Sequence, residues 1–303
     1  MLVKKYWRRG CAVLLAVLVL FSFTPPGQWL LDRLERLTGM TDFQDVGLSS
    51  PFSLHVIDVG KADALCILVD GEALLIDGGT IAQGDEVADY LQRLGVKKLR
   101  AVFNTHPDDD HIGGLGIVLQ RFDCGVFYCP SVPEDMMPDT QSVRNVRLLL
   151  KEKDIPVEYL SADDSFSFGN MQIDVLSPCR EYESTNNQSL VLRLVYGSRT
   201  FLLMGDAETD AEEDLLVSGR TLSADVLKVG HHGSNTSTTE AFLQAVSPQF
   251  AVISTGEDGN HLPRNPVLQR LEACTELYRT DTDGTVIFCS DGEVLIVYTQ
   301  NHS

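Results

Sequence analysis

Short apolar runs separated by glycine mark the first part of the folded chain. Residues 53–59, 64–69 and 73–76 are such runs, and each is closely followed by a glycine or a glycine pair. Apolar runs of this length bounded by turn residues predict three successive strands joined by tight turns.

The pattern then changes to a helical period. Val87, Tyr90, Leu91 and Leu94 lie three, one and three residues apart, and Gly95 follows them. This spacing predicts a helix that ends at the glycine. Residues 99–104 form a buried strand whose C-terminal end leads into a polar loop, the usual place for functional residues in layered α/β folds.

The rest of the chain alternates in the same way, without an internal repeat or a mid-chain linker. It predicts one α/β domain in which helices cover sheets. The predicted helices span residues 112–121, 141–153, 207–217, 238–246 and 265–273. The predicted strands span residues 126–129, 157–176 with a break at Gly169-Asn170, 190–196, 200–204, 225–229, 250–253, 276–278, 285–289 and 293–298.

The N-terminus has the pattern of a targeting segment. Four cations among the first nine residues precede an apolar run from Cys11 to Phe23, which Pro25-Pro26-Gly27 ends. This predicts a signal peptide over residues 1–27. The run is shorter than the roughly 20 residues of a spanning helix, but no clear cleavage site follows, so an uncleaved membrane anchor is the alternative. Residues 28–50 are interpreted as a linker with a short helix at 29–37, and residues 51–303 as the folded domain. The protein is then secreted or anchored on the outer face of the cytoplasmic membrane.

Composition limits the choice of partners. The 303 residues carry a formal net charge of −19, and 44% of them are hydrophobic. Such a charge disfavours nucleic acid unless a local basic patch or bound metal offsets it; Lys228, Arg264, Arg279 and Arg193 are the candidates for a patch. Six cysteines follow the leader, and Cys124 with Cys129 is the best candidate for a disulfide in an exported chain.

The strongest chemical signal is the loop from Thr105 to Gly114. It holds His106, Asp108, Asp110 and His111 within six residues. Alternate residues of an extended segment point the same way, so the first three can converge, and His111 follows where the glycine pair starts a helix. Imidazole with carboxylate suits zinc or manganese better than calcium. Four such groups favour two ions over one, against the alternative of an Asp-rich turn.

Two later strand ends carry similar groups. Asp206 follows Met204-Gly205 and either points into a cleft or caps the next helix. His231 and His232 are adjacent, lie between Gly230 and Gly233, and follow a predicted strand. Glycines there allow close approach of the backbone.

These motifs, in this order, resemble the metallo-β-lactamase fold, and within it the hydrolase domain of the competence protein ComEC and its stand-alone relatives. The matching motifs are 58–63, 75–79, 106–114, 186–192, 203–206, 225–234 and 278–281. The resemblance implies a four-layer αββα sandwich with two divalent metal ions, zinc or manganese, at one edge of the sheets.

The resemblance also implies roles for the residues. Asp206 bridges both ions; His106 and Asp108 bind the first ion, and Asp110 and His111 the second. One of His231 and His232 completes the second site, and His232 is favoured. His231 and Asp110 are the catalytic candidates, His231 at the substrate and Asp110 as acceptor of the water's proton. Asp77 orients a ligating imidazole, while Asp63, Asn186, Asn187 and Lys228 lie in matching motifs without a defined role.

The departures from the family pattern affect the substrate more than the fold. No histidine lies between His111 and His231, so the usual third imidazole of the first ion is absent and Asn186 or Asn187 lies there instead. The family's Gln-Gly in its first motif is Lys61-Ala62 here. The expected activity is hydrolysis by a metal-activated water. The first hypothesis for the substrate is a phosphodiester such as single-stranded DNA. The alternatives are an esterase of small or cell-wall phosphoesters, such as phosphorylcholine, and a non-catalytic surface binding module.

Overall fold

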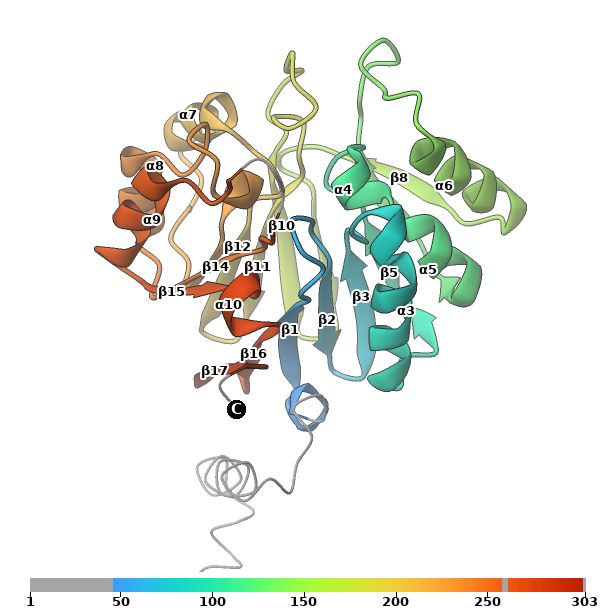
Figure 1. The fold of residues 1–303 in the computed structure, drawn as a ribbon, viewed down its shortest axis with the longest axis horizontal. Coiled ribbons are helices and arrows are strands. Elements are labelled where there is room, and N and C mark those ends of the chain that lie inside the picture. The colour runs from blue at the N-terminus through green and yellow to red at the C-terminus, as the bar shows by residue number, and fades with distance from the viewer. Residues whose placement is uncertain (1–45, 258–260, 302–303) are drawn as a thin grey trace, which may run out of the picture.

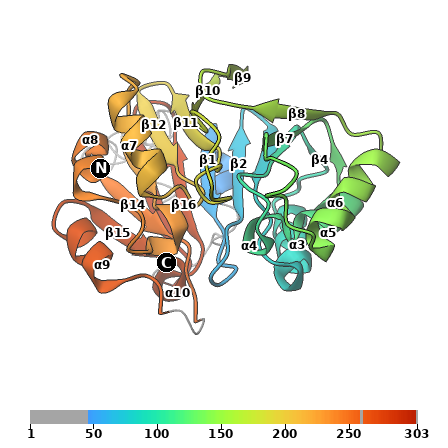
Figure 2. The same ribbon diagram turned by 90° about the horizontal axis from the view of Figure 1, so that it is seen from above.

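Two β-sheets lie face to face and carry helices on their outer sides. The computed structural model describes residues 46–257 and 261–301. Helices α3, α5 and α6 cover one outer side and α7, α8 and α9 the other, as Figures 1 and 2 show from two directions. The four-layer αββα sandwich predicted from the sequence is confirmed.

The first sheet has eight strands in the order β17-β16-β1-β2-β3-β5-β7-β8. Its middle is the antiparallel group of β16, β1, β2 and β3, while β3, β5, β7 and β8 run parallel. The bounds are β1 (Phe52–Val56), β2 (Leu65–Val69), β3 (Glu72–Ile76), β5 (Ala101–Phe103), β7 (Phe127–Pro130), β8 (Val157–Leu160), β16 (Val286–Ser290) and β17 (Leu295–Thr299). A separate two-stranded sheet joins β4 (Lys98–Leu99) to β6 (Asp123–Cys124).

The second sheet has seven strands in the order β15-β14-β13-β12-β11-β10-β9. Strands β12, β13, β14 and β15 are parallel, so their carboxyl ends share one edge. The bounds are β9 (Ser165–Phe168), β10 (Met171–Ser177), β11 (Val191–Tyr196), β12 (Arg199–Leu203), β13 (Val226–Lys228), β14 (Phe250–Ile253) and β15 (Glu276–Arg279).

The helices follow from caps and from apolar stripes. Thr140 and Thr239 accept hydrogen bonds from the third residue after them and so cap α6 and α8, which satisfies backbone groups that a helix start leaves open. The helices are α3 (Gly84–Arg93), α4 (Asp109–Ile112), α5 (Leu115–Arg121), α6 (Gln141–Glu152), α7 (Thr209–Val217), α8 (Glu240–Val246), α9 (Asn265–Glu272) and α10 (Thr280–Asp283). Short 3-10 turns are η2 (Gly47–Ser49), η3 (Ile81–Gln83) and η4 (Gly230–Gly233).

Alternation along the strands divides the apolar residues among three cores. Phe52, Leu54 and Val56 of β1 face the space between the sheets, together with residues such as Ile173 of β10. The opposite face of the first sheet packs on α3, α5 and α6, and that of the second on α7, α8 and α9. Because strand side chains alternate between faces, each sheet holds an inner and an outer core at once.

Some expectations differ from the structure. The first strand ends at Val56, three residues earlier than predicted. The packed part begins before Pro51: Val46, in the segment interpreted as linker, is buried against Ile287 and Cys289. The predicted leader and the helix at 29–37 lie outside the described residues. Within residues 46–257 and 261–301, no helix has the length and apolar character needed to cross a bilayer.

The predicted disulfide is wrong. Cys124 and Cys129 are both free thiols. The Cys124 sulfur donates to the carbonyl of Val126 at 3.2 Å, whereas Cys129 packs in the core beneath α6 and lines the cavity there. The strand between the two thiols holds them apart, which proximity in sequence could not reveal.

Candidate metal centre

Four strand ends deliver the polar groups of the site. Asp77 follows β3, the loop from Asn104 to His111 follows β5, Asp206 follows β12, and the tandem histidines follow β13. Strands β3 and β5 are parallel, as are β12 and β13. Carboxyl ends of parallel strands share an edge, so the two sheets bring their acidic and imidazole groups to the same end of the sandwich.

Glycines allow this edge to close. A Cβ on Gly114 would overlap the carbonyl oxygen of Gly78, and a Cβ on Gly78 would lie 2.7 Å from the Leu115 backbone nitrogen. Only a residue without a side chain permits such contact between the loop after β3 and the start of α5. His231 and His232 have positive φ values of 47° and 51°, a conformation that side chains other than glycine rarely adopt and that is retained mostly at functional sites.

Each imidazole is held by its Nδ1, so that its Nε2 points inward. His111 Nδ1 lies 2.8 Å from Asp77 Oδ2. His232 Nδ1 lies 2.9 Å from the Ser254 carbonyl oxygen, to which it donates. His106 Nδ1 is 3.3 Å from the Ser189 hydroxyl. Metal-ligating histidines are usually fixed in this way through the second nitrogen, which sets the tautomer and the ring direction.

The inward atoms have no hydrogen-bond partner. These buried atoms are Nε2 of His106, His111 and His232 and Oδ1 of Asp206. Leaving such polar atoms unsatisfied is costly unless something else binds them. The described residues therefore fit a metal centre on their own geometry. The same residues appear in two of the three candidate ion-binding groups among them, His106–His111–Asp206 and Asp110–His111–His232.

Asp206 lies between the imidazoles. Its Oδ1 is 3.3 Å from His111 Nε2, and its Oδ2 is 3.9 Å from His106 Nε2 and 3.8 Å from His232 Nε2. Two ligands about 2.1 Å from one ion lie about 3.4 Å apart at a tetrahedral angle. Asp206 is thus within ligand spacing of all three imidazoles, as a bridging carboxylate requires.

The two remaining carboxylates, Asp108 and Asp110, lie next to different histidines of the site. Asp108 Oδ2 is 3.8 Å from His106 Nε2, and Asp110 Oδ2 is 3.6 Å from His232 Nε2. The loop therefore places Asp108 with His106 and Asp110 with His232, the pairing that the resemblance implies.

The electrostatics favour a cation. Burial alone would raise the pKa of Asp206, but the neighbouring imidazoles of His111 and His232 outweigh it, and this pKa is well below its usual range. Burial would lower the pKa of His111, but Asp206 and Asp77 raise it well above the ordinary value. His106, by contrast, has a lowered pKa because of burial and the nearby charge of His111. Carboxylates that stay charged when buried create a negative potential in which a divalent ion binds well.

His231 lies at the rim of the site. Its side chain is 23% exposed, its Nδ1 is 3.1 Å from Glu208 Oε1, and its Nε2 is 3.9 Å from Asp206 Oδ2. Burial would lower the pKa of His231, but the hydrogen bond to Glu208 and the charge of Asp206 raise it. His231 is therefore a candidate proton donor facing the open side.

The residues without a defined role separate into two groups. Asp63 and Lys228 form an ion pair of 2.8 Å with side chains that are 2% and 1% exposed, directly behind His232, whose Nδ1 is 3.9 Å from Asp63 Oδ1. Asn187 has a structural role. Its Oδ1 accepts hydrogen bonds from the backbone N–H of Glu208, at 2.9 Å, and from that of Ala211, at 3.4 Å. Since these bonds hold the start of α7, that oxygen is engaged away from the ions. The backbone carbonyl of Asn186 accepts a hydrogen bond from the Ser189 N–H.

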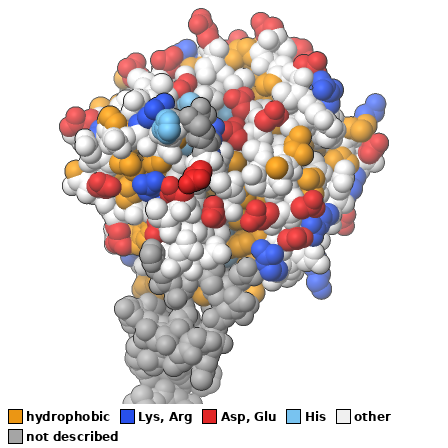
Figure 3. Space-filling view, in the orientation of Figure 1, with side chains coloured by type: hydrophobic (Ala, Val, Ile, Leu, Met, Phe, Trp, Pro, Cys, Tyr) orange, Lys and Arg blue, Asp and Glu red, His pale blue; other side chains and the backbone are white. Residues whose placement is uncertain are grey.

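Three of the four residues considered for a basic patch pair with acidic side chains. Lys228 is buried, Arg193 pairs with Asp174 at 3.7 Å, and Arg279 pairs with Asp281 at 2.6 Å. On the face shown in Figure 3, histidine reaches the surface beside acidic side chains, and lysines and arginines are scattered among acids rather than gathered in a track.

Three supporting residues were not singled out from the sequence. Thr105 donates its hydroxyl to Asp77 Oδ2 at 2.6 Å, Ser189 accepts from the Asp206 backbone nitrogen at 3.1 Å, and Glu208 holds His231. Each lies one or two residues from, or inside, a motif already identified. Proximity to a motif was the available signal, but their direction depends on the fold.

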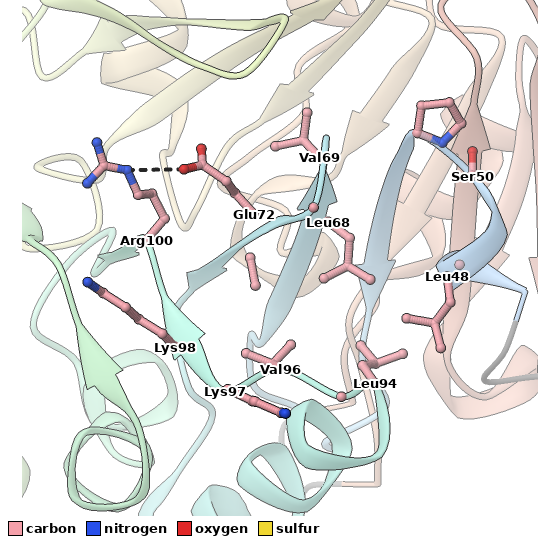
Figure 4. Close-up of a pocket in the computed structure, with 15 residues that line it drawn as sticks. Leu48, Ser50, Leu68, Val69, Glu72, Leu94, Val96, Lys97, Lys98 and Arg100 are labelled. Carbon is pink, nitrogen blue, oxygen red and sulfur yellow. Dashed lines mark ion pairs between the residues drawn. The ribbon is translucent and has the colours of Figure 1, made fainter.

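Two cavities lie outside the cluster of ligands. One of about 500 Å³ borders the metal loop at Pro107 and Ile112 and extends under α6, where Met137 and Val146 line it. Another of about 670 Å³ lies at the far end of β3 from Asp77, as its lining by Glu72 shows. Figure 4 shows this second cavity with Lys97, Lys98 and Arg100 around it. The second cavity is therefore remote from the metal centre.

Comparison with known proteins agrees with the geometry. Residues 59–257 match the family model described as the Metallo-beta-lactamase superfamily. ComE operon protein 3 of Bacillus subtilis (strain 168) is 32% identical over 264 residues, which cover 79% of this chain and 33% of that protein. Recombination protein 2 of Haemophilus influenzae is 30% identical over 264 residues, 84% of this chain and 30% of that protein. The chain thus spans about a third of the length of these relatives.

Solved structures show the same fold. The metallo-beta-lactamase fold protein YhfI from Bacillus subtilis superposes with a TM-score of 0.51 at 14% identity, covering 78% of this chain and 99% of that one. Igni18, a metallo hydrolase from Ignicoccus hospitalis, gives a TM-score of 0.51 at 16% identity, with 78% and 98% covered.

Proposed function

Because the chain belongs to the metallo-beta-lactamase superfamily, we propose that it is a phosphodiesterase that uses two divalent ions. One observation carries the proposal. Three imidazole Nε2 atoms and an oxygen of Asp206, all buried and without hydrogen-bond partners, converge at one edge of the sheets. His106, Asp108 and Asp206 would hold one ion, and Asp110, His111, His232 and Asp206 the other. This mixed nitrogen and oxygen set suits zinc or manganese.

The chain's own residues support a hydrolytic role for this site. Ions bound there supply Lewis acidity, which lowers the pKa of water to about 7 and offsets charge at a phosphoryl centre. Asp110 has a pKa below its usual range, since its contacts with His232 and His111 outweigh burial; it therefore stays ionised, as a ligand must, but accepts a proton poorly. We therefore assign proton transfer to His231. Its Nδ1 is held by Glu208, which with Asp206 raises the pKa of the ring despite burial, and its position at the open rim lets it donate a proton to the leaving-group oxygen.

Two substrate classes have support from different observations. A nucleic-acid strand is favoured by the relative named Recombination protein 2, whose name refers to recombination. A small or cell-wall phosphoester is favoured by the formal net charge of −19, because such a charge repels a long polyanion. A phosphodiester at a metal centre is common to both, and it is the reaction that we propose.

The test pairs metal quantification with turnover. The full chain is purified without chelator, its zinc and manganese are measured, and hydrolysis of a chromogenic phosphodiester is followed. About two ions per chain and turnover that chelation abolishes and added metal restores would support the proposal. A chain with two ions and no turnover of any phosphoester would contradict it and favour a surface binding module. Single-stranded DNA and choline-bearing teichoic acid then separate the two substrate classes.

We also propose an extracytoplasmic location, which the sequence of residues 1–27 supports through its cationic start and apolar run. The phosphoester substrate would then be met outside the cytoplasmic membrane. Cell fractionation checks this: recovery of the chain with the cytosolic proteins would contradict it.

A further inference from the structure

Lys61 occupies the position next to the second ion's ligands. Its Nζ lies 2.7 Å from Asp110 Oδ2, and the two side chains are 20% and 21% exposed. The same Asp110 oxygen is 3.6 Å from His232 Nε2. One carboxylate oxygen thus faces both an ammonium group and the imidazole with which it would bind an ion.

The backbone around Lys61 is fixed by its surroundings. Gly60 has a φ of +70° and donates its N–H to Asp58 Oδ1 at 3.2 Å, and the N–H of Ala62 donates back to the Gly60 carbonyl. A Cβ on Gly256 would lie 2.9 Å from the Lys61 nitrogen, so this loop and the segment after β14 are in close contact. The N–H of Asp63 donates to the Asp110 carbonyl at 3.1 Å. The loop therefore holds Lys61 beside the metal loop.

The ammonium of Lys61 also lies near the open side of the site. Its charge acts on His231, where it opposes the raised pKa. The other lysine of the site, Lys228, is 1% exposed and engaged with Asp63. Lys61 is partly exposed, so its flexible stem can shift its charge by a few ångströms, which a buried lysine cannot.

We propose that Lys61 is a tethered cation with two positions. Without an ion at Asp110, it pairs with that carboxylate and competes with the divalent ion. When the ion binds there, the repelled ammonium faces the anionic group of the substrate and binds it. The second position rests on the proposed function, and the first does not.

The physical basis is competition between charges for one oxygen. An ammonium and a divalent cation repel each other strongly at the few ångströms that a shared carboxylate imposes, so the pair with Lys61 must weaken when the ion binds. Partly exposed ion pairs change equilibria by up to roughly fivefold. A phosphoryl oxygen then offers the ammonium an equivalent anionic partner.

The experiment compares Lys61→Gln, Lys61→Arg and Lys97→Gln in the full chain. Lys97 is exposed and remote from the metal loop, so Lys97→Gln makes the same change in net charge elsewhere. Calorimetric titration of the chelator-treated proteins with Mn²⁺ alone measures ion affinity. Titration of the Mn²⁺-loaded proteins with inorganic phosphate measures anion affinity.

We expect opposite changes in the two titrations. Lys61→Gln should bind the ion at the Asp110 site roughly two- to fivefold more tightly and phosphate roughly two- to fivefold more weakly. Lys61→Arg keeps the charge and should stay closer to wild type in both, as should Lys97→Gln. A merely structural role would weaken both affinities together. Unchanged ion affinity in Lys61→Gln overturns the competition, and unchanged phosphate affinity overturns the substrate contact.

The ion titration is independent of turnover. If wild type binds two ions but hydrolyses no phosphoester, the proposed function fails while the competition at Asp110 is still tested. If turnover is normal and Lys61→Gln titrates as wild type does, Lys61 has no such role although the function stands.

Discussion

The buried pair of Lys228 and Asp63 gives the sharpest test of how the site is supported. Lys228 Nζ lies 2.8 Å from Asp63 Oδ2 and also donates to the Val229 carbonyl at 3.0 Å. The two side chains are 1% and 2% exposed. Lys228→Met would remove the ammonium and leave the Asp63 carboxylate buried without its ion-pair partner.

The expected loss is large because an isolated buried charge is expensive. Breaking a buried pair from one side costs about 3–5 kcal/mol. For a domain of this size each kcal/mol lowers Tm by about 2–4 °C, so the midpoint should fall by about 6–20 °C. The double variant Asp63→Asn/Lys228→Met removes both charges and should recover part of the loss, because no uncompensated charge then stays in the interior.

The measurement is urea and thermal unfolding of the chelator-treated full chain. The exposed pair of Arg144 and Asp139, whose side chains are 58% and 90% exposed, provides the control: Arg144→Met should cost at most about 1 kcal/mol. A loss of unfolding free energy below about 1 kcal/mol for Lys228→Met would refute the reasoning. So would a double variant whose loss equals the sum of the losses of the two single variants. Since the Asp63 backbone also holds Asp110 and Gly79, ion binding should weaken alongside stability.

Three further results are expected. His111→Ala should remove the second ion and reduce turnover to the background rate, since His111 is assigned to that ion together with Asp110 and His232; metal quantification with two ions still bound would count against this assignment. His231→Ala should keep both ions but lower kcat by roughly 10²–10⁴-fold if the ring donates the proton, and an unchanged kcat would exclude that role. Burial lowers the pKa of His55 to about 3 from 6.5; the unfolded chain therefore takes up a proton that the folded chain does not, and stability should fall as pH drops from about 6.5 toward 3. His55→Asn should flatten that slope in urea titrations at pH 7, 5 and 4, and equal slopes would show that another group is responsible.

Much of the fold could be predicted because the apolar patterns are local. The hairpin of β11 and β12 and the helical stripe of α3 follow from the spacing of neighbouring residues. Pairing between distant strands does not: β1 lies beside β16, which follows it by more than 200 residues. A strand that is buried on both faces reads as a continuous apolar run, and such a run does not indicate which other strand it pairs with.

The metal loop could be predicted for a similar reason. His106, Asp108, Asp110 and His111 are close in sequence, so any compact turn brings them together. The direction of side chains in the later motifs was decided by tertiary contacts. Asn187 caps α7 instead of facing the ions, and Lys228 points inward to Asp63 instead of outward to a substrate.

The sequence by itself determined the chemical inventory: which acids and imidazoles exist, that they follow strands, and that the apolar runs can form layers. Only the tertiary structure decided which of their atoms face one another. Local spacing fixes where a residue lies along the backbone. The direction of a buried polar atom depends on partners that come from remote segments, as Ser254 does for His232 and Asp77 for His111.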